Sequence, residues 1–208
     1  MKKIFLLFIF LVIKSNFVYS QWESVGPNGG SVENIYANNS YLFVSMINNG
    51  LFRSSNNGSN WSRLSLNSNS GGSILAGNGS NLICGMGDDG IFKSSDNGNS
   101  WTSAGAGLPT GRAKMLAVNN NAFYISFSSA SGLYKSTDNG LTWNLINTTV
   151  TFSGLTFSGS NIFGRDGNSV SFSTNGGLNW STINSGLPQG FSSNGGLAIS
   201  STNSSVFI

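Results

Sequence analysis

The sequence predicts an all-β fold built from repeated units, and three observations support this. A twelve-residue pattern ending in Trp occurs four times, at Trp61, Trp101, Trp143 and Trp180. With Trp22, the intervals between tryptophans are 39, 40, 42 and 37 residues. A period of about 40 residues with several short strands is typical of propeller blades. Aromatic residues make up 12% of the 208 residues, which favours a packed fold over disorder. The prediction is a β-propeller of four-stranded antiparallel blades.

Each copy of the pattern is expected to form a strand, a tight turn and a return strand. The clearest copy runs from Gly132 to Trp143 and reads Gly-Leu-Tyr-Lys-Ser-Thr-Asp-Asn-Gly-Leu-Thr-Trp. Its Leu and Tyr favour a half-buried strand. In the segment Ser-x-Asp-x-Gly, which we call the repeated turn, Asp138 can accept hydrogen bonds from backbone N–H groups just ahead of it. Gly140 can take the positive φ that such a turn needs.

The other copies keep this spacing with one variation. The second and third copies have Asp, whereas the first and fourth have Asn, which still offers one carbonyl oxygen as an acceptor. The four sets are Ser54, Asn56, Gly58 and Trp61; Ser94, Asp96, Gly98 and Trp101; Ser136, Asp138, Gly140 and Trp143; Ser173, Asn175, Gly177 and Trp180. We expect the four tryptophans to be largely buried at equivalent places, because each lies three residues after the turn glycine.

This spacing, most complete around Asp96 and Asp138, resembles the Asp-box, also called the BNR repeat. The resemblance implies a hairpin at the outer edge of a propeller blade, between its third and fourth strands, and a structural rather than catalytic Asp. Asp-boxes occur in sialidases, xyloglucan-cleaving glycosidases, sortilin-type receptors and photosystem II assembly factors. These families share no single activity, so the resemblance implies a fold and leaves the function open.

The first 20 residues have the pattern of a signal peptide. Lys2 and Lys3 precede an apolar run from Ile4 to Ile13, which is too short to span a bilayer. Val18 and Ser20 fit a cleavage site before Gln21. We therefore expect an exported protein, secreted or at the cell surface, with residues 21–208 as the mature propeller and no membrane span in that mature chain.

Composition excludes several functional classes. Loss of Lys2, Lys3 and Lys14 with the signal leaves seven basic and seven acidic residues, so no basic patch favours nucleic acid. The sequence has no histidine, which excludes Ser-His-Asp nucleophile systems and His-ligated zinc. Its one cysteine, Cys84, lies in an apolar run and is expected to be a buried small hydrophobe. No cofactor or metal site is predicted.

The units are expected to be four blades and part of a fifth, with no helix after the signal. The expected boundaries are 31–66, 72–106, 112–148, 152–184 and a partial unit at 194–208. In the third unit, for example, the predicted strands are Lys114–Val118, Ala122–Phe127, Leu133–Thr137 and Trp143–Ile146. Trp22–Val25 matches a fourth strand with no first three before it, and is expected to close the final blade. The sequence thus predicts an incomplete, open propeller belonging to a longer natural product.

Ligand-binding residues are expected in the loops from second to third strand and from blade to blade. The first kind lie at Asn48–Gly50, Asp88–Gly90, Ser129–Gly132 and Asp166–Ser169, and the second kind add Arg112, Lys114 and Asn184–Asn194. The candidate binding residues are Asp88, Asp89, Arg112, Arg165 and Asp166. Asp88 and Asp89 fit acid–base work or a hard cation, or else a solvated turn. Arg112 and Arg165 fit an anionic ligand, or else an exposed strand end.

The function that fits these observations is a non-catalytic binding or interaction module for a glycan or another protein. The alternative is the N-terminal part of a sialidase-like or other Asp-box glycoside hydrolase, and a third possibility is a scaffold within a larger cell-surface protein. The catalytic set of a sialidase is not recognisable, since the sequence has no Phe-Arg-Ile-Pro motif and only Glu23 and Glu33 as glutamates. We assign no catalytic residue, and the oligomeric state stays open.

Overall fold

The computed structural model describes residues 26–27, 31–47, 49–66, 73–167, 169–186, 198–199 and 206–207. The signal peptide predicted at 1–20 and the closing strand predicted at Trp22–Val25 lie outside these residues, as does most of the partial unit at 194–208. Of that unit, the structure describes β17 (Ala198–Ile199) and β18 (Val206–Phe207), which pair antiparallel.

Four antiparallel four-stranded sheets follow one another along the chain, each in simple up-and-down order. Blade 1 contains β1 (Val32–Ala37), β2 (Leu42–Met46), β3 (Gly50–Ser54) and β4 (Ser62–Arg63). Blade 2 contains β5 (Ser73–Asn78), β6 (Asn81–Met86), β7 (Ile91–Ser94) and β8 (Thr102–Ser103). Blade 3 contains β9 (Ala113–Asn119), β10 (Ala122–Phe127), β11 (Leu133–Ser136) and β12 (Asn144–Asn147). Blade 4 contains β13 (Gly154–Ser158), β14 (Asn161–Asp166), β15 (Ser169–Ser173) and β16 (Ser181–Thr182).

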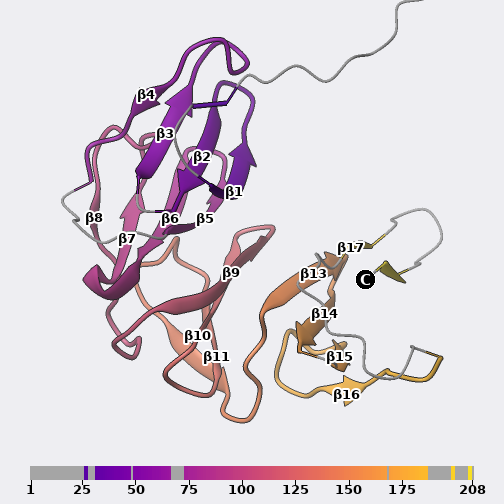
Figure 1. Cartoon of the computed structure of the whole chain (residues 1–208). Helices are drawn as coiled ribbons and strands as arrows, with labels where there is room; N and C mark the ends of the chain where they lie inside the picture. Colours follow the sequence, from indigo (N-terminus) through magenta and orange to yellow (C-terminus); the bar gives the residue numbers. More distant parts are fainter. Residues whose placement is uncertain are drawn as a thin grey trace, which may run out of the picture.

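The sheets are arranged as the blades of an open propeller. The first strands of successive blades lie against one another, from β1 to β5, β9 and β13. Figure 1 shows the four sheets following an arc in chain order, with β17 beside β13. The all-β propeller prediction is therefore confirmed.

In blade 3, the first three strands begin and end within one residue of their predicted bounds. Two other expectations were wrong. Each fourth strand begins one residue after its tryptophan, because the tryptophan belongs to the turn: Trp101 Nε1 donates to the carbonyl of Gly98 at 3.1 Å and Trp180 Nε1 to Gly177 at 2.9 Å. In addition, one turn of 3-10 helix, η1 (Gly87–Asp89), forms where no helix was expected.

The repeated turns have one hydrogen-bonding scheme centred on the serine hydroxyl. In blade 2, Ser94 Oγ accepts the backbone N–H of Gly98 at 2.8 Å and donates to Asp96 Oδ1 at 2.7 Å. That carboxylate in turn accepts the N–H of Ser100 at 2.9 Å. The other three turns repeat these bonds, with Asn56 and Asn175 in place of Asp in blades 1 and 4. All four serines are buried, so both functions of each hydroxyl are satisfied inside the protein.

The glycine of each turn is needed for its backbone conformation, and in blades 2 and 3 it is needed also because it has no side chain. Its φ lies between 79° and 95° in all four turns, a left-handed conformation that side chains disfavour. In addition, a Cβ at Gly98 would lie 2.8 Å from Leu64 Cδ1 of blade 1, and one at Gly140 would overlap Ile83 Cδ1 of blade 2. The glycines of blades 2 and 3 therefore let their turns contact the preceding blade directly.

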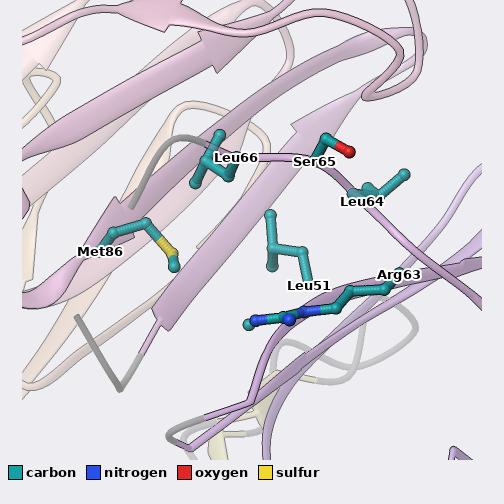
Figure 2. A pocket seen from close by; sticks show the side chains of 7 residues that line it. Leu51, Arg63, Leu64, Ser65, Leu66 and Met86 are labelled. Carbon is teal, nitrogen blue, oxygen red and sulfur yellow. The ribbon is translucent and has the colours of Figure 1, made fainter. Parts of the chain in front are cut away.

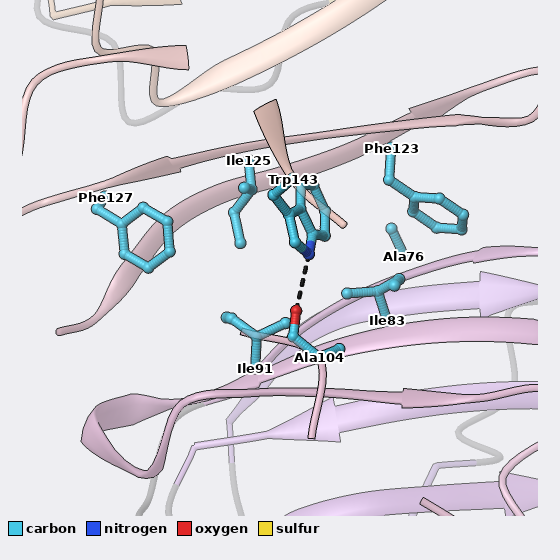
Figure 3. Close-up of a cluster of buried hydrophobic side chains, with 8 residues drawn as sticks. All are labelled: Ala76, Ile83, Ile91, Ala104, Phe123, Ile125, Phe127 and Trp143. Atoms are coloured by element: carbon cyan, nitrogen blue, oxygen red, sulfur yellow. Dashed lines mark hydrogen bonds between the residues drawn. The ribbon is translucent and has the colours of Figure 1, made fainter. Parts of the chain in front are cut away.

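Three apolar clusters hold the blades together, one at each boundary. Between blades 2 and 3, Ile83 and Ile91 pack against Phe123, Ile125 and their neighbours (Figure 3). The cluster between blades 1 and 2 contains Cys84, which is fully buried and whose thiol pKa is raised by that burial. A third cluster joins blades 3 and 4. The core thus lies between sheets, where each blade face covers the next.

Trp101, Trp143 and Trp180 lie at these boundaries, although the repeated tryptophans are less buried than predicted. Of the four tryptophans that follow the repeated turns, only Trp143 is buried, and its Nε1 donates to the carbonyl of Ala104 in blade 2 at 2.8 Å (Figure 3). Trp61, Trp101 and Trp180 are half-buried. A Cβ placed on the turn glycine of blades 2, 3 or 4 would lie 3.4–3.8 Å from the ring of the tryptophan that follows, so these three rings share one position. Trp143 differs because its indole N–H reaches the neighbouring blade instead of its own turn.

A basic residue adds a polar link between blades. Arg53 on β3 donates to the carbonyl of Asn97 at 2.7 Å and to Asn99 Oδ1 at 2.9 Å, both in the repeated turn of blade 2. Its guanidinium also lies over the Tyr41 ring, 4.7 Å from the centroid. Lys93 and Lys135 occupy the same place in β7 and β11, as the strand registers show.

Because the turn glycine contacts the preceding blade, its replacement by alanine should destabilise the protein more than the same replacement of a glycine that makes no such contact. Gly140→Ala should lower the free energy of unfolding by about 2–4 kcal/mol, from left-handed strain and overlap with Ile83 together. Gly159→Ala is the matched control, because Gly159 has a φ of 59° but nothing within 4 Å of its Cβ position. It should cost only about 1–2 kcal/mol. Urea unfolding of both variants checks this, and equal losses would contradict it.

The turn carboxylates predict a loss of stability in acid. Hydrogen bonds, chiefly from Ser100 and from Thr142, lower the pKa of Asp96 and of Asp138 to about 2, from an ordinary value of 3.8. A carboxylate whose pKa is lower in the folded than in the unfolded protein stabilises the fold at pH values above the unfolded-state pKa. This stabilisation is lost as the pH falls from about 4 towards 2. The Asp96→Asn, Asp138→Asn double variant should therefore show a flatter dependence of unfolding free energy on pH in this range. An unchanged slope, or carboxyl NMR titrations near 3.8 for both, would contradict it.

Candidate functional site

The loops expected to bind a ligand gather at one end of the blades. Because the strands of each sheet alternate in direction, the loops from second to third strand and from blade to blade share one end. The repeated turns lie at the opposite end. We call the first end the loop face. It carries η1 in blade 2 and the 128–132 loop in blade 3.

The candidate residues are spread over three blades of the loop face. Asp88 and Asp89 are both exposed in η1 of blade 2. Arg112 is exposed just before β9, and its carbonyl accepts the N–H of Ser128 at 3.1 Å. Arg165 and Asp166 are consecutive residues at the end of β14 in blade 4.

Asp166 forms an ion pair with Lys114, a residue that was predicted to belong to a loop between blades. Lys114 Nζ lies 2.7 Å from Asp166 Oδ1 and donates to the carbonyl of Thr151 at 3.3 Å. These contacts connect β9 of blade 3 with blade 4. The side chains of Lys114 and Asp166 are 30% and 50% exposed, so the pair contributes at most about 1 kcal/mol. Its charges remain accessible to a ligand.

Arg165, by contrast, is a packed residue rather than an open anion site. It is only 8% exposed, and its guanidinium lies 3.9 Å from the Cβ position of Gly154. Its carbonyl accepts both the N–H of Ser153 at 2.7 Å and the Ser153 hydroxyl at 3.0 Å. Strand alternation places its side chain on the opposite sheet face from that of Asp166. The interpretation of Arg165 as an exposed strand-end arginine is wrong, because the residue is buried.

A hollow in the loop face between blades 1 and 2 was missed by sequence reasoning. It has a volume of about 360 Å³. Figure 2 shows its residues, in which Arg63 lies below Leu51 with Met86 at the side. The lining residues are Gly50, Leu51, Arg63, Leu64, Ser65, Leu66 and Met86. No local pattern marks Arg63, because the hollow exists only where two blades meet.

A second hollow lies at the opposite end, between blades 3 and 4. It has a volume of about 430 Å³, and amide and hydroxyl side chains are among those that line it. Asn119, Asn120 and Asn121 line one side, and Asn175 with Thr174 the other. The Lys135 ammonium lies 5.3 Å from the Tyr124 ring centroid. Such a lining can hydrogen-bond polyhydroxylated ligands.

Within the ranges that the structure describes, no three Asp, Glu, Cys or His side chains gather where they could hold a metal ion. In the same ranges, no helix is long and apolar enough to cross a membrane.

Fold and blade arrangement define the class of protein as a β-propeller. Residues 12–121, more than half of the chain, match the family described as the DUF6242 beta propeller domain. The chain therefore belongs to the DUF6242 beta propeller domain family. No curated protein matches it in sequence.

Solved structures share the fold at low sequence identity. An ancestral GH74 enzyme is 21% identical with a TM-score of 0.60, over 78% of this chain and 25% of its own. YCF48 bound to D1 peptide is 18% identical with a TM-score of 0.59, over 77% of this chain and 57% of its own. The GH74 xyloglucanase from Xanthomonas campestris is 19% identical with a TM-score of 0.57, over 72% of this chain and 29% of its own. This chain thus spans about a quarter of the GH74 enzymes and just over half of YCF48.

Proposed function

We propose that the chain is an exported Asp-box β-propeller that acts as a non-catalytic binding module for a glycan or another protein. One observation carries the proposal: half of the carboxylates that the structure describes are engaged in the fold, and no acid–nucleophile pair can be assigned among the others. Asp96 and Asp138 hold repeated turns, and Asp166 pairs with Lys114. The others are Glu33 on β1 and the neighbours Asp88 and Asp89.

Asp88 and Asp89 are poorly suited to glycoside hydrolysis. That reaction needs an acid and a nucleophile or base on opposite sides of the scissile bond, about 5–9.5 Å apart. Consecutive residues of a 3-10 helix are turned by about 120° from each other, so their carboxylates diverge. Both are also exposed to solvent, whereas a general acid of this kind lies in an apolar pocket.

Binding is favoured by surfaces that remain open. The amide-lined hollow between blades 3 and 4 offers donors and acceptors for sugar hydroxyls. A protein ligand is favoured by the likeness to YCF48, a propeller whose structure holds a bound peptide. Because the two sequences are only 18% identical, the likeness concerns the fold alone. The proposed ligand class is therefore argued from the polar surfaces of this chain.

The alternative function is part of a glycoside hydrolase, and the GH74 neighbours favour it. Since this chain spans only about a quarter of their length, a catalytic pair could arise only together with residues outside the part that matches. Under this alternative, Asp88 or Asp166 would supply one of the two carboxylates.

A turnover assay separates the two functions. The purified chain should release no product from a fluorogenic sialoside or β-glucoside, because no acid–nucleophile pair can be assigned. The same preparation should retain ligands on a glycan or peptide array. Hydrolysis that disappears in Asp88→Asn, Asp89→Asn or Asp166→Asn, but persists in the control Glu33→Gln, would contradict the proposal.

Export is tested by the location and the N-terminal residue of the expressed chain. Expressed in a bacterial host with its first 20 residues, the chain should be found outside the cytoplasm, with Gln21 as its N-terminal residue by mass spectrometry. An intact N-terminus in the cytoplasmic fraction would contradict export.

A further inference from the structure

The repeated turn of blade 4 differs from the other three in the place of its asparagine. In blades 1 to 3, the residue before the turn glycine is Asn57, Asn97 or Asn139, each with a φ between 54° and 58°. In blade 4 this place is taken by Gly176, with a φ of 73°, and the asparagine is one residue earlier, at Asn175. Asn175 is therefore followed by a glycine that is not the turn glycine.

An asparagine that is followed by glycine can lose its side-chain amide without an enzyme. The glycine nitrogen, after losing its proton, attacks Cγ of the asparagine. The new N–Cγ bond closes a succinimide ring, and the side-chain nitrogen leaves as ammonia. Water then opens the ring to give aspartate or isoaspartate. Because glycine has no Cβ beside the attacking nitrogen, ring closure depends mainly on whether the glycine N–H is free.

In blades 1 to 3, the turn serine occupies the nitrogen that would attack. The N–H groups of Gly58, Gly98 and Gly140 each donate to a buried serine hydroxyl at 2.8 Å. These three glycines are themselves buried. For the nitrogen to attack, this hydrogen bond must break inside the protein, which costs free energy. The asparagines of these turns are thus protected by the same contact that shapes the turn.

In blade 4, the serine contact falls one residue beyond the nitrogen that would attack. Ser173 Oγ accepts the N–H of Gly177 at 3.0 Å, whereas the N–H of Gly176 makes no hydrogen bond within the described part of the chain. Asn175 is exposed and Gly176 is half-buried, so water reaches both residues. The Lys135 ammonium lies 3.7 Å from the Cβ position of Gly176. A cation at this distance favours the deprotonated form of the nitrogen, which is the form that attacks.

The side chain of Asn175 is held with its carbonyl oxygen between two donors. Asn175 Oδ1 accepts the Ser173 hydroxyl at 3.0 Å and the N–H of Asn179 at 2.9 Å. Negative charge develops on this oxygen while the nitrogen attacks Cγ, and both donors stabilise that charge.

Blade 1 has the same side-chain arrangement without the glycine. Asn56 Oδ1 accepts the Ser54 hydroxyl at 2.9 Å and the N–H of Asn60 at 2.9 Å, but the next residue is Asn57. Among the four repeated turns, all of which the structure describes, Asn175 alone combines the two donors with a following glycine whose N–H is free.

We propose that Asn175 is a modification site at which the folded chain deamidates itself through the nitrogen of Gly176, while the turn serines protect the Asn-Gly pairs of blades 1 to 3. The co-reactant is water, and ammonia is released. This inference goes beyond the proposed binding function and does not depend on it. Asn175 and Lys135 both line the amide-lined hollow, so the reaction adds a carboxylate beside the one charged residue of that lining.

The blade 4 turn can hold an aspartate at position 175. Asp96 and Asp138 occupy the equivalent place in blades 2 and 3, where each accepts the serine hydroxyl at 2.7 Å and a backbone N–H at 2.9 Å. Conversion to aspartate therefore changes the charge of the hollow while the turn keeps its hydrogen bonds.

The test compares the four turns within one protein. The full mature chain is incubated at neutral pH, folded or in urea, and peptide mass spectrometry follows the replacement of each amide by a carboxyl group. A sample taken at the start corrects for conversion during digestion. In the folded chain, Asn175 should convert at least about tenfold faster than Asn57, Asn97 or Asn139, because their glycines must first break a buried hydrogen bond. In urea, the four rates should be similar.

Gly176→Asn is the matched variant. It gives blade 4 the Asn-Asn-Gly sequence of blade 1, in which Asn57 has the same left-handed conformation, so the turn should still form. The conversion of Asn175 should then fall to the level of Asn56. A thermal unfolding curve close to that of the unchanged protein shows that the fold is kept.

Three results would overturn the inference: Asn175 stays an amide in the folded chain, the other three asparagines convert as fast as Asn175 in the folded chain, or Gly176→Asn leaves the rate unchanged. None of these results bears on the proposed function, which the turnover assay and the ligand arrays test separately.

Discussion

The structure depends on one small interaction, the hydrogen bond from the turn glycine N–H to the buried serine hydroxyl four residues earlier. Its length is 2.8 Å in blades 1 to 3 and 3.0 Å in blade 4. It holds the glycine left-handed, with no side chain on the surface that meets the preceding blade. Because an isolated sheet of this size cannot bury both faces, this close contact is what lets each blade cover the next.

The loop face is free to specialise because the turns that join the blades lie at the other end. Charged residues are only 8% of the chain, and several of them link one element to another, as Arg53 and Lys114 do. A cation outside such links, Arg63, lies in a hollow on the loop face. Because the turns are at the other end, the loops of this face can differ from blade to blade while the turn-to-blade contacts stay the same.

Sequence reasoning predicted what is local and missed what depends on two blades. The turn of Ser136, Asp138 and Gly140 and the first three strands were predictable, because their signals lie within a few residues. The pairing of Lys114 with Asp166 spans 52 residues, and no periodicity announces it. For the same reason the burial of Arg165, the reach of Trp143 to blade 2 and the hollow around Arg63 became visible only when neighbouring blades were in place.

The central claim, that the turn glycine is required by contact with the preceding blade, is tested most directly by a double-mutant cycle between Gly140 and Ile83. Ile83→Val removes the Cδ1 atom that a Cβ at residue 140 would overlap. The unfolding free energy lost through Gly140→Ala should therefore be smaller in the Ile83→Val background, by about 1 kcal/mol or more. If the two losses add within about 0.5 kcal/mol, the glycine serves its own turn alone and the account is contradicted.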